Sequence, residues 1–276
     1  MRLFNFSAAM AVAIAAPLCA VAGPATQAAA NDPLTASLQQ AASRGALIYA
    51  YDQAAWHGTD DMLAKIPHPE QVIGGWIVDG PAATPELVFF DKNDADPHAV
   101  YVAEFRENKF VSGRLLGPDD DTKLSPQRLQ LIKARKIGLD TFFAAKVDRC
   151  ADRHYNTVVL PPVAPGAPTL IYVLTPQIDN DHIPFGGHYL VEVAPDGKAA
   201  APRPFTKSCL SMPVKGGKEK SEMVTITHLL DPTPTEIHVF SSLAAHLPVV
   251  VLTTQNRRMW VVEGNRIIEM DSSKIK

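Results

Sequence analysis

The densest cluster of polar side chains in this sequence is Asp179-Asn180-Asp181-His182, followed closely by Gly186-Gly187-His188. Carboxylate and imidazole groups together suit a divalent metal ion. The cluster lacks the helical two-histidine spacing of a zinc protease and the acidic spacing of a calcium-binding loop. Asp and Asn also stabilise turns without a ligand, and paired glycines permit unusual backbone angles. The pattern favours a structural turn, with a binding loop or a metal site as the alternatives.

Three further histidines, His154, His228 and His238, lie near the ends of predicted elements. Each is a candidate general base if a nucleophile comes within hydrogen-bond reach, although a histidine without a catalytic role is the commoner case. A hydrolase would use Asp179, Asp181, His182 and His188 to hold a metal ion and activate water, with His228 as an optional addition. The candidate ligand-binding residues are Asp179, Asp181, His182, His188 and His228. Either role is strengthened if segments 179–188 and 231–240 meet in one pocket.

Asp52 is a separate candidate because it falls on an apolar helical stripe, among Ile48, Ala55 and Trp56. An unpaired carboxylate is costly to bury, so Asp52 needs a partner or a place at the edge of the stripe. A hydrogen bond to a tyrosine, a tryptophan or a backbone donor is the simplest expectation. A catalytic carboxylate with a raised pKa is the alternative.

The common signatures of nucleophilic catalysis and nucleotide binding do not occur after the first thirty residues. The sequence there has no Gly-x-Ser-x-Gly elbow, phosphate-binding loop, dinucleotide fingerprint or Cys-x-x-Cys pair. We therefore favour a binding or interaction protein that needs no cofactor, with a small molecule or a protein as its partner.

The first thirty residues predict export. Arg2 supplies a positive charge, and the apolar run from Ala8 to Ala22 has about the 15-residue length of a signal peptide, too short to span a membrane. Cleavage is expected after Ala22 or after Ala30. Lipid anchoring through Cys19 is not expected, because Leu18 stands where a small residue is needed. The mature protein is expected in the periplasm or outside the cell.

Removal of this leader leaves two cysteines, Cys150 and Cys209, in a compartment where disulfides persist. A bridge between them is the main covalent prediction, and two separate buried thiols are the alternative. The leader carries one basic residue and no acidic one, so the mature chain has a net charge near minus four. That charge gives no electrostatic footprint for nucleic acid. No later apolar segment is long enough to cross a membrane.

Helical patterns occur at three places. Apolar spacing predicts a helix over residues 34–65, with Asp32-Pro33 at its start and a break near Gly45 as the alternative. Ser125-Pro126 predicts the start of a second helix, which should end near residue 147. Its expected buried residues are Leu129, Ile132, Leu139, Phe143 and Val147. Thr233 and Glu236 have the spacing of a capping box and predict a third, short helix, although residues 236–240 also suit a strand.

Strand patterns fill most of the remaining sequence. They cover residues 72–78, 86–91, 99–105, 110–115, 157–160, 169–174, 188–193, 223–227, 249–253, 259–262 and 266–269. The glycine- and charge-rich segment 215–222 is predicted to be a flexible loop. Hairpin-like spacing between the strands favours antiparallel pairing. We therefore expect an α+β fold of predominantly antiparallel sheets, with a long N-terminal, a central and a short C-terminal helix. Residues 31–276 should form one domain, and two closely packed halves divided near residues 117–150 are the alternative.

Overall fold

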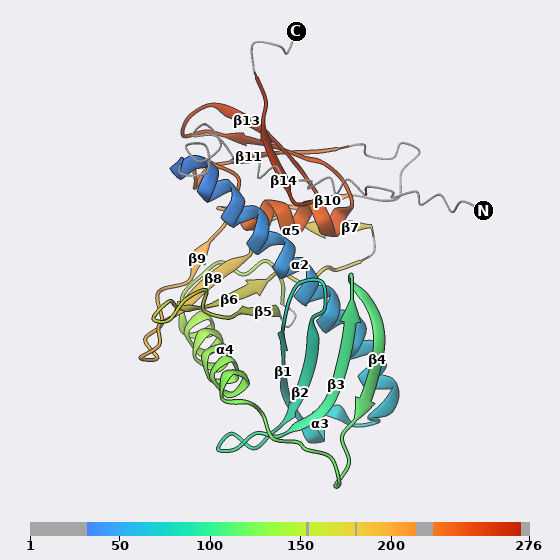
Figure 1. Ribbon diagram of the computed structural model, residues 1–276. Coiled ribbons are helices and arrows are strands. Elements are labelled where there is room, and N and C mark those ends of the chain that lie inside the picture. The colour runs from blue at the N-terminus through green and yellow to red at the C-terminus, as the bar shows by residue number, and fades with distance from the viewer. Residues whose placement is uncertain (1–31, 153–154, 180, 214–222, 272–276) are drawn as a thin grey trace, which may run out of the picture. The chain divides into compact units, whose positions relative to one another are not determined.

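The computed structural model describes residues 32–152, 155–179, 181–213 and 223–271. The predicted leader, the predicted loop at 215–222 and His154 lie outside the described residues. The chain divides into two units, residues 1–36 and 37–276. Helix α2 (Pro33–Lys65) begins in the first unit, and the second holds every other described helix and strand. The fold is α+β with antiparallel-rich sheets, as predicted (Figure 1).

Helix α2 is one continuous element of 33 residues, so the alternative of a break near Gly45 is wrong. Its start is the predicted one, because the Asp32 carboxylate accepts the Thr35 backbone N–H (3.1 Å) and Pro33 occupies the first turn. The helix ends at Lys65, shortly before Pro67. Its buried residues are Ala41, Gly45, Ile48, Ala50, Tyr51, Ala54, Gly58 and Met62.

Gly45 of α2 packs closely against helix α5 (Glu236–Ala245). A Cβ at this position would lie 2.4 Å from the Val239 Cβ and 2.5 Å from the Glu236 carbonyl oxygen. Helix propensity alone predicts that Gly45→Ala is stabilising, by about 1 kcal/mol. We expect the opposite, a loss of about 2 kcal/mol of unfolding free energy in urea titration, because the helices must separate. Gly117→Ala is the control, because a Cβ there would meet only Asp120 Oδ2, at an ordinary contact distance of 3.7 Å. Stabilisation of the Gly45 variant would contradict this packing.

Two four-stranded antiparallel sheets lie side by side (Figure 1). The first consists of β1 (Ile73–Asp79), β2 (Glu86–Asp91), β3 (Ala99–Arg106) and β4 (Lys109–Leu115), in that order. The second has the order β5 (Asn156–Leu160), β6 (Thr169–Leu174), β8 (Tyr189–Val193) and β9 (Arg203–Pro204). Strand β1 contacts β5 where the two sheets meet. The β3–β4 hairpin has its turn at Glu107 and Asn108, whose positive φ angles of 50° and 61° suit a two-residue turn.

Helices α2 and α4 (Pro126–Ala144) cover opposite faces of these sheets. Alternate residues of a strand point to opposite faces. In β6, Leu170, Tyr172 and Leu174 pack in the core that contains Ile48 and Tyr51 of α2. The intervening Ile171 and Val173 pack with Ala134 and Phe142 of α4. Both helices are therefore fixed by a shared layer of strands.

Ser125 caps α4 as predicted and accepts the Arg128 N–H at 3.2 Å, but the predicted buried face is only partly correct. Leu129, Ile132, Leu139 and Val147 are partly buried and pack against the core. The buried residues are Leu131, Ala134, Gly138 and Phe142. Phe143, which was expected inside, is 48% exposed. Gly138 lies on this most buried face, where its missing side chain lets the helix approach Ile171 of β6. The helix also ends at Ala144, three residues earlier than predicted.

The C-terminal sheet has the order β11 (Val224–His228), β12 (Val249–Thr253), β13 (Arg258–Glu263) and β14 (Arg266–Glu269). Its last three strands pair antiparallel in sequence order and form a meander, in line with the predicted antiparallel pairing. Strands β11 and β12 are parallel, because α5 forms the crossover between them. The capping position of α5 differs from the prediction: Thr235, not Thr233, is the N-cap, and His238 Nδ1 accepts its backbone N–H at 2.9 Å. Residues 236–240 are helical, so the strand alternative is wrong.

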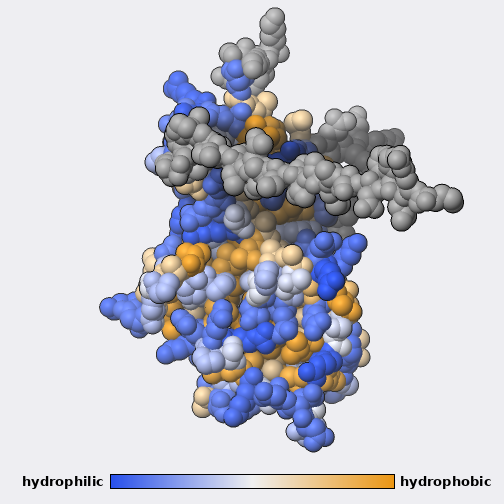
Figure 2. Space-filling view, in the orientation of Figure 1, coloured by the Kyte–Doolittle hydropathy of each residue, from blue (hydrophilic) through white to orange (hydrophobic). Residues whose placement is uncertain are grey.

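The remaining elements are short and were not predicted. They are helix α3 (Pro69–Val72) and the paired strands β7 (His182–Pro184) and β10 (Ser211–Pro213). Cys150 and Cys209 form the predicted disulfide, with Cα atoms 5.4 Å apart. No described helix has the length and hydrophobicity needed to span a bilayer. The face shown in Figure 2 is a mixture of hydrophilic and hydrophobic residues.

Candidate functional site

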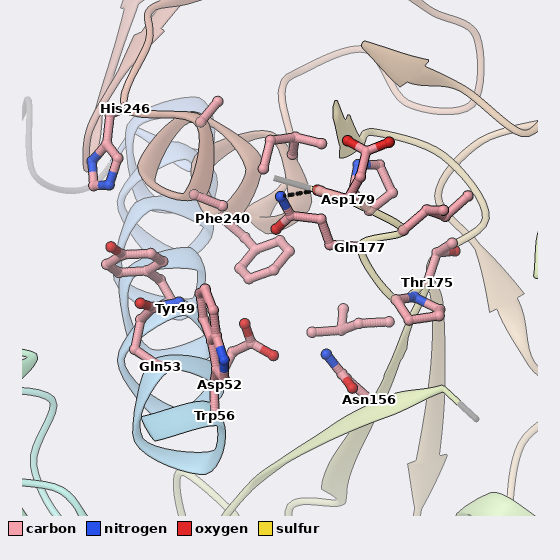
Figure 3. Close-up of a pocket in the computed structure, with 17 residues that line it drawn as sticks. Tyr49, Asp52, Gln53, Trp56, Asn156, Thr175, Gln177, Asp179, Phe240 and His246 are labelled. Carbon is pink, nitrogen blue, oxygen red and sulfur yellow. Dashed lines mark hydrogen bonds between the residues drawn. The ribbon is translucent and has the colours of Figure 1, made fainter. Parts of the chain in front are cut away.

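A cavity of about 460 Å³ lies between the middle of α2, the C-terminal end of β6, strand β7 and the C-terminal end of α5 (Figure 3). Its polar lining residues are Tyr49, Asp52, Gln53, Asn156, Thr175, Gln177, Asp179 and His246. Its apolar lining residues are Trp56, Leu174, Pro176, Ile178, Ile183, Pro184, Phe240, Ala244 and Ala245. With Asn156 of β5, five elements of the fold converge on one space, which we call the Asp52 cavity.

Asp52 is the charged group that extends from α2 into this cavity, toward Asn156 of β5 (Figure 3). Asp52 is half-buried; desolvation raises the pKa of its carboxyl to about 6, and the nearby Asn156 side chain partly opposes that rise. Asp52 thus lies at the edge of the apolar stripe, where it lines the cavity, and the Asn156 side-chain amide is the neighbour that favours its charged form.

Tyr49, Gln53 and Trp56 stand beside Asp52 on the same side of α2 (Figure 3). Burial, together with the nearby Asp52 charge, raises the pKa of the Tyr49 phenol, which therefore stays protonated at neutral pH. The Trp56 indole is 51% exposed and stacks on the His57 ring, with centroids 5.1 Å apart. The cavity thus has an accessible aromatic wall directly next to its carboxylate.

A second cavity of about 660 Å³ adjoins the first and shares Pro176 and Gln177 with it. It is lined by Phe143, Arg149, Ala151, Asp152 and Tyr155 as well. Arg149 lies 5.9 Å from the centre of the Phe143 ring. The described lining of the Asp52 cavity, in contrast, includes no Lys or Arg side chain.

The predicted cluster at Asp179 forms a turn. Asp179 Oδ1 accepts the backbone N–H groups of Asp181 and His182, both at 2.8 Å, and lies 2.9 Å from His182 Nδ1. The His182 interaction is the main cause that lowers the pKa of Asp179. Although Asp179 lines the cavity, its carboxylate points away from Asp52 (Figure 3). These contacts match the structural turn that the residue pattern favoured.

His188 is fully buried and both of its ring nitrogens are engaged. Nδ1 accepts the Thr175 N–H at 3.1 Å, so the proton lies on Nε2, which donates to the Pro184 carbonyl at 3.0 Å. Burial lowers the pKa of His188 to about 4, and the ring is neutral at pH 7. His188 therefore links Pro184 of β7 to Thr175, the residue after β6. No nitrogen lone pair of its ring is left for a ligand.

His228 lies in a different cluster, at the start of α5. Its Nε2 is 3.0 Å from Asp231 Oδ2, and its ring meets His238 edge-on at 4.6 Å. Asp231 also accepts from Arg203 Nη2 at 2.6 Å. Burial, and secondarily the neighbouring His228, lowers the pKa of His238 to about 3. Neither histidine lines the Asp52 cavity.

Segments 179–188 and 231–240 do meet at the Asp52 cavity, through Asp179, Ile183, Pro184 and Phe240. They meet mainly through apolar residues, and His228 is not among the lining residues. Within the described ranges, no three His, Cys, Asp or Glu side chains come together in a way that could hold a metal ion. The metal-dependent hydrolase that would use Asp181, His182 and His188 stays a prediction.

The disulfide supports one wall of the cavity. Gly187 has a φ of +78°, and a Cβ there would lie 2.3 Å from Cys150 Sγ and 2.7 Å from Thr175 Oγ1. Thr175, which lines the cavity, donates its hydroxyl to the Gly186 carbonyl at 3.0 Å. The paired glycines of the predicted cluster thus let the crosslink pack against the cavity wall.

Most of the cavity residues were missed by sequence reasoning. Tyr49, Gln53 and Trp56 were not candidates, yet with Asp52 they have the 0, 3, 4, 7 spacing of one helical stripe. This mixed aromatic and polar stripe beside the apolar one is the signal that could have revealed them. Asn156 and Gln177 had no comparable signal, because only the tertiary fold brings them to α2.

The raised pKa of Asp52 predicts that the ionised Asp52 carboxylate destabilises the folded protein. A carboxyl whose folded-state pKa exceeds its unfolded value lowers stability above the folded pKa, and this penalty disappears as the pH falls toward 3.8. We expect Asp52→Asn to add about 2 kcal/mol of unfolding free energy at pH 8, and progressively less below pH 6. Urea unfolding across this range measures it. Asp60→Asn, on an exposed part of α2, should show no such gain, and an Asp52→Asn variant less stable than wild type at pH 8 would rule out the raised pKa.

No family model, curated protein or solved structure matches this chain. The function of the Asp52 cavity is therefore inferred from the side chains that line it.

Proposed function

We propose that this protein is an exported, non-catalytic binding protein that holds a small molecule in the Asp52 cavity. The observation that carries the proposal is a carboxylate that extends into a preformed space with aromatic and aliphatic walls. Cavities of several hundred Å³, mostly apolar with a few convergent polar groups, are typical of small-molecule sites. Asp52, Asn156 and Gln53 are the convergent polar groups here.

The polar side chains around the cavity support binding better than catalysis. The Thr175 hydroxyl is committed to the Gly186 carbonyl, and the Gln177 amide donates to the Asp179 carbonyl at 2.6 Å. The lining within the described residues contains no cysteine, serine or lysine that would serve as a nucleophile. These groups position the walls and leave Asp52 and its neighbours to contact a ligand.

Export is supported by two independent features. The first thirty residues have the composition and apolar length of a signal peptide. The Cys150–Cys209 disulfide fits an oxidising compartment outside the cytoplasm. We therefore place the function in the periplasm or outside the cell.

Fluorine NMR of protein labelled with 5-fluorotryptophan tests the site directly. The three tryptophans give three resonances, and Trp56→Phe identifies the one at the cavity. We expect at least one of four millimolar probes, phenethylamine, 2-phenylethanol, phenylacetate or glucose, to shift the Trp56 resonance. Ala244→Phe, which fills the cavity from α5, should abolish the shift, and Ala144→Phe at the exposed end of α4 should not. If none of the four probes moves the Trp56 resonance, the proposed function is wrong.

A further inference from the structure

We propose that the ligand of the Asp52 cavity is an organic ammonium ion that carries an aromatic or aliphatic group. This inference rests on the proposed function and specifies the chemical class of its ligand. It follows from three features of the cavity. Its described lining has a carboxylate but no Lys or Arg, aromatic side chains lie beside Asp52, and apolar residues from other elements complete the lining.

The first feature is a carboxylate without a cationic partner. Buried carboxylates in proteins are paired with cations or ligate metals, because an isolated charge is costly to bury. Asp52 is paired only with the neutral Asn156 amide among the groups that shift its pKa. The described lining contains no Lys or Arg, and Arg149 belongs to the adjoining cavity. A ligand ammonium group would supply the missing charge, whereas a ligand carboxylate or phosphate would be repelled.

The second feature is the aromatic pair next to this charge. Tyr49 and Trp56 lie three residues before and four residues after Asp52, so all three side chains project from neighbouring turns of α2 (Figure 3). Electron-rich ring faces attract ammonium groups, and indole does so most strongly. The half-exposed Trp56 ring is available for this contact. A carboxylate beside two aromatic rings therefore selects a cation over a neutral group of equal size.

The third feature is the apolar part of the lining outside α2. Leu174, Ile183 and Phe240 are at most 6% exposed and close the cavity, whereas Ile178, also in the lining, is 61% exposed and offers accessible aliphatic surface. Burying a hydrocarbon group against this lining stabilises a complex by about 25 cal/mol per Å² of apolar surface. Small metal cations and ammonium itself cannot use that surface. An amine with an aromatic or aliphatic group matches both parts of the lining.

The test compares molecules of similar size that differ in charge. Phenethylamine is a cation at pH 7.5, 2-phenylethanol is neutral and phenylacetate is an anion. We expect phenethylamine to shift the Trp56 fluorine resonance with the lowest dissociation constant, at least about tenfold below that of the alcohol. In Asp52→Asn protein its affinity should fall about tenfold or more, while the affinity for 2-phenylethanol stays within about twofold. Asp60→Asn removes the same charge from an exposed position of α2 and should change neither value.

The outcomes separate this inference from the proposed function. If 2-phenylethanol, phenylacetate or glucose binds at Trp56 as tightly as phenethylamine, the site binds small molecules but the ammonium class is wrong. The same conclusion follows if Asp52→Asn leaves phenethylamine affinity unchanged. If no probe binds at Trp56, the proposed function itself fails. Because Asp52→Asn is expected to stabilise the fold, loss of amine affinity in this variant cannot be attributed to unfolding.

Discussion

Replacing both Cys150 and Cys209 with serine is expected to lower the unfolding free energy by about 4 kcal/mol. The crosslink joins residues 59 positions apart, so its removal releases a long loop in the unfolded chain. It also removes the Cys150 sulfur atom that packs against Gly187. Urea unfolding of the double variant against the oxidised wild type measures the loss.

Reduced wild-type protein is the control for this experiment, because it lacks the crosslink but keeps both side chains. It should unfold at nearly the same urea concentration as the double variant. A loss below about 1 kcal/mol would show that the bridge adds little to this fold, contrary to the loop-entropy argument. A far larger loss in the variant than on reduction would instead assign the effect to packing at Gly187.

Acidification is expected to destabilise the protein by a similar amount, through His188 and His238. Their folded-state pKa values, about 4 and about 3, lie below the ordinary value of 6.5. The unfolded chain therefore binds protons that the folded protein excludes, so the stability contributed by each neutral ring is complete above pH 6.5 and is lost as the pH falls. At pH 5 each histidine should remove about 2 kcal/mol relative to pH 7.5.

Asp52 has the opposite effect on the unfolding free energy over part of this pH range. Its pKa is raised to about 6, so its destabilising charge is neutralised as the pH falls. The acid transition is therefore best measured by urea unfolding in the Asp52→Asn background. His238→Gln keeps an acceptor for the Thr235 N–H and removes one titrating ring. This variant should show about half of the loss between pH 7.5 and pH 5. An unchanged pH dependence would mean that His238 is not buried as a neutral ring.

The fold was predictable where local chemistry decides it. Asp32-Pro33 and Ser125-Pro126 marked two helix starts, and the even cysteine count after the leader indicated the bridge. Prediction failed where a tertiary contact decides. The most buried face of α4 includes Gly138, which packs against Ile171, and the α5 cap shifts to Thr235 because His238 accepts its N–H. Elements as short as α3, β7 and β9 have too few residues for a periodic pattern.

The candidate site was only partly predictable. Asp52 stood out because a carboxylate on an apolar stripe conflicts with burial, and this conflict did mark the cavity. The polar cluster at 179–188 attracted attention by its density, yet its Asp and His groups mostly satisfy each other and the backbone. Asn156 lies more than a hundred residues after Asp52, so no spacing rule connects them. Unusual burial was thus a better guide here than polar density.

The continuity of α2 has a consequence for the thermodynamics of binding. Tyr51, next to Asp52, is fully buried in the core and donates its hydroxyl to the Gly80 carbonyl at 2.6 Å. The helical backbone that presents Tyr49, Asp52 and Trp56 is therefore already ordered before any ligand arrives. Preorganised side chains lose little conformational entropy on association. Calorimetric titration should accordingly show a small entropic penalty from the protein, and recognition at this cavity would resemble a lock and key.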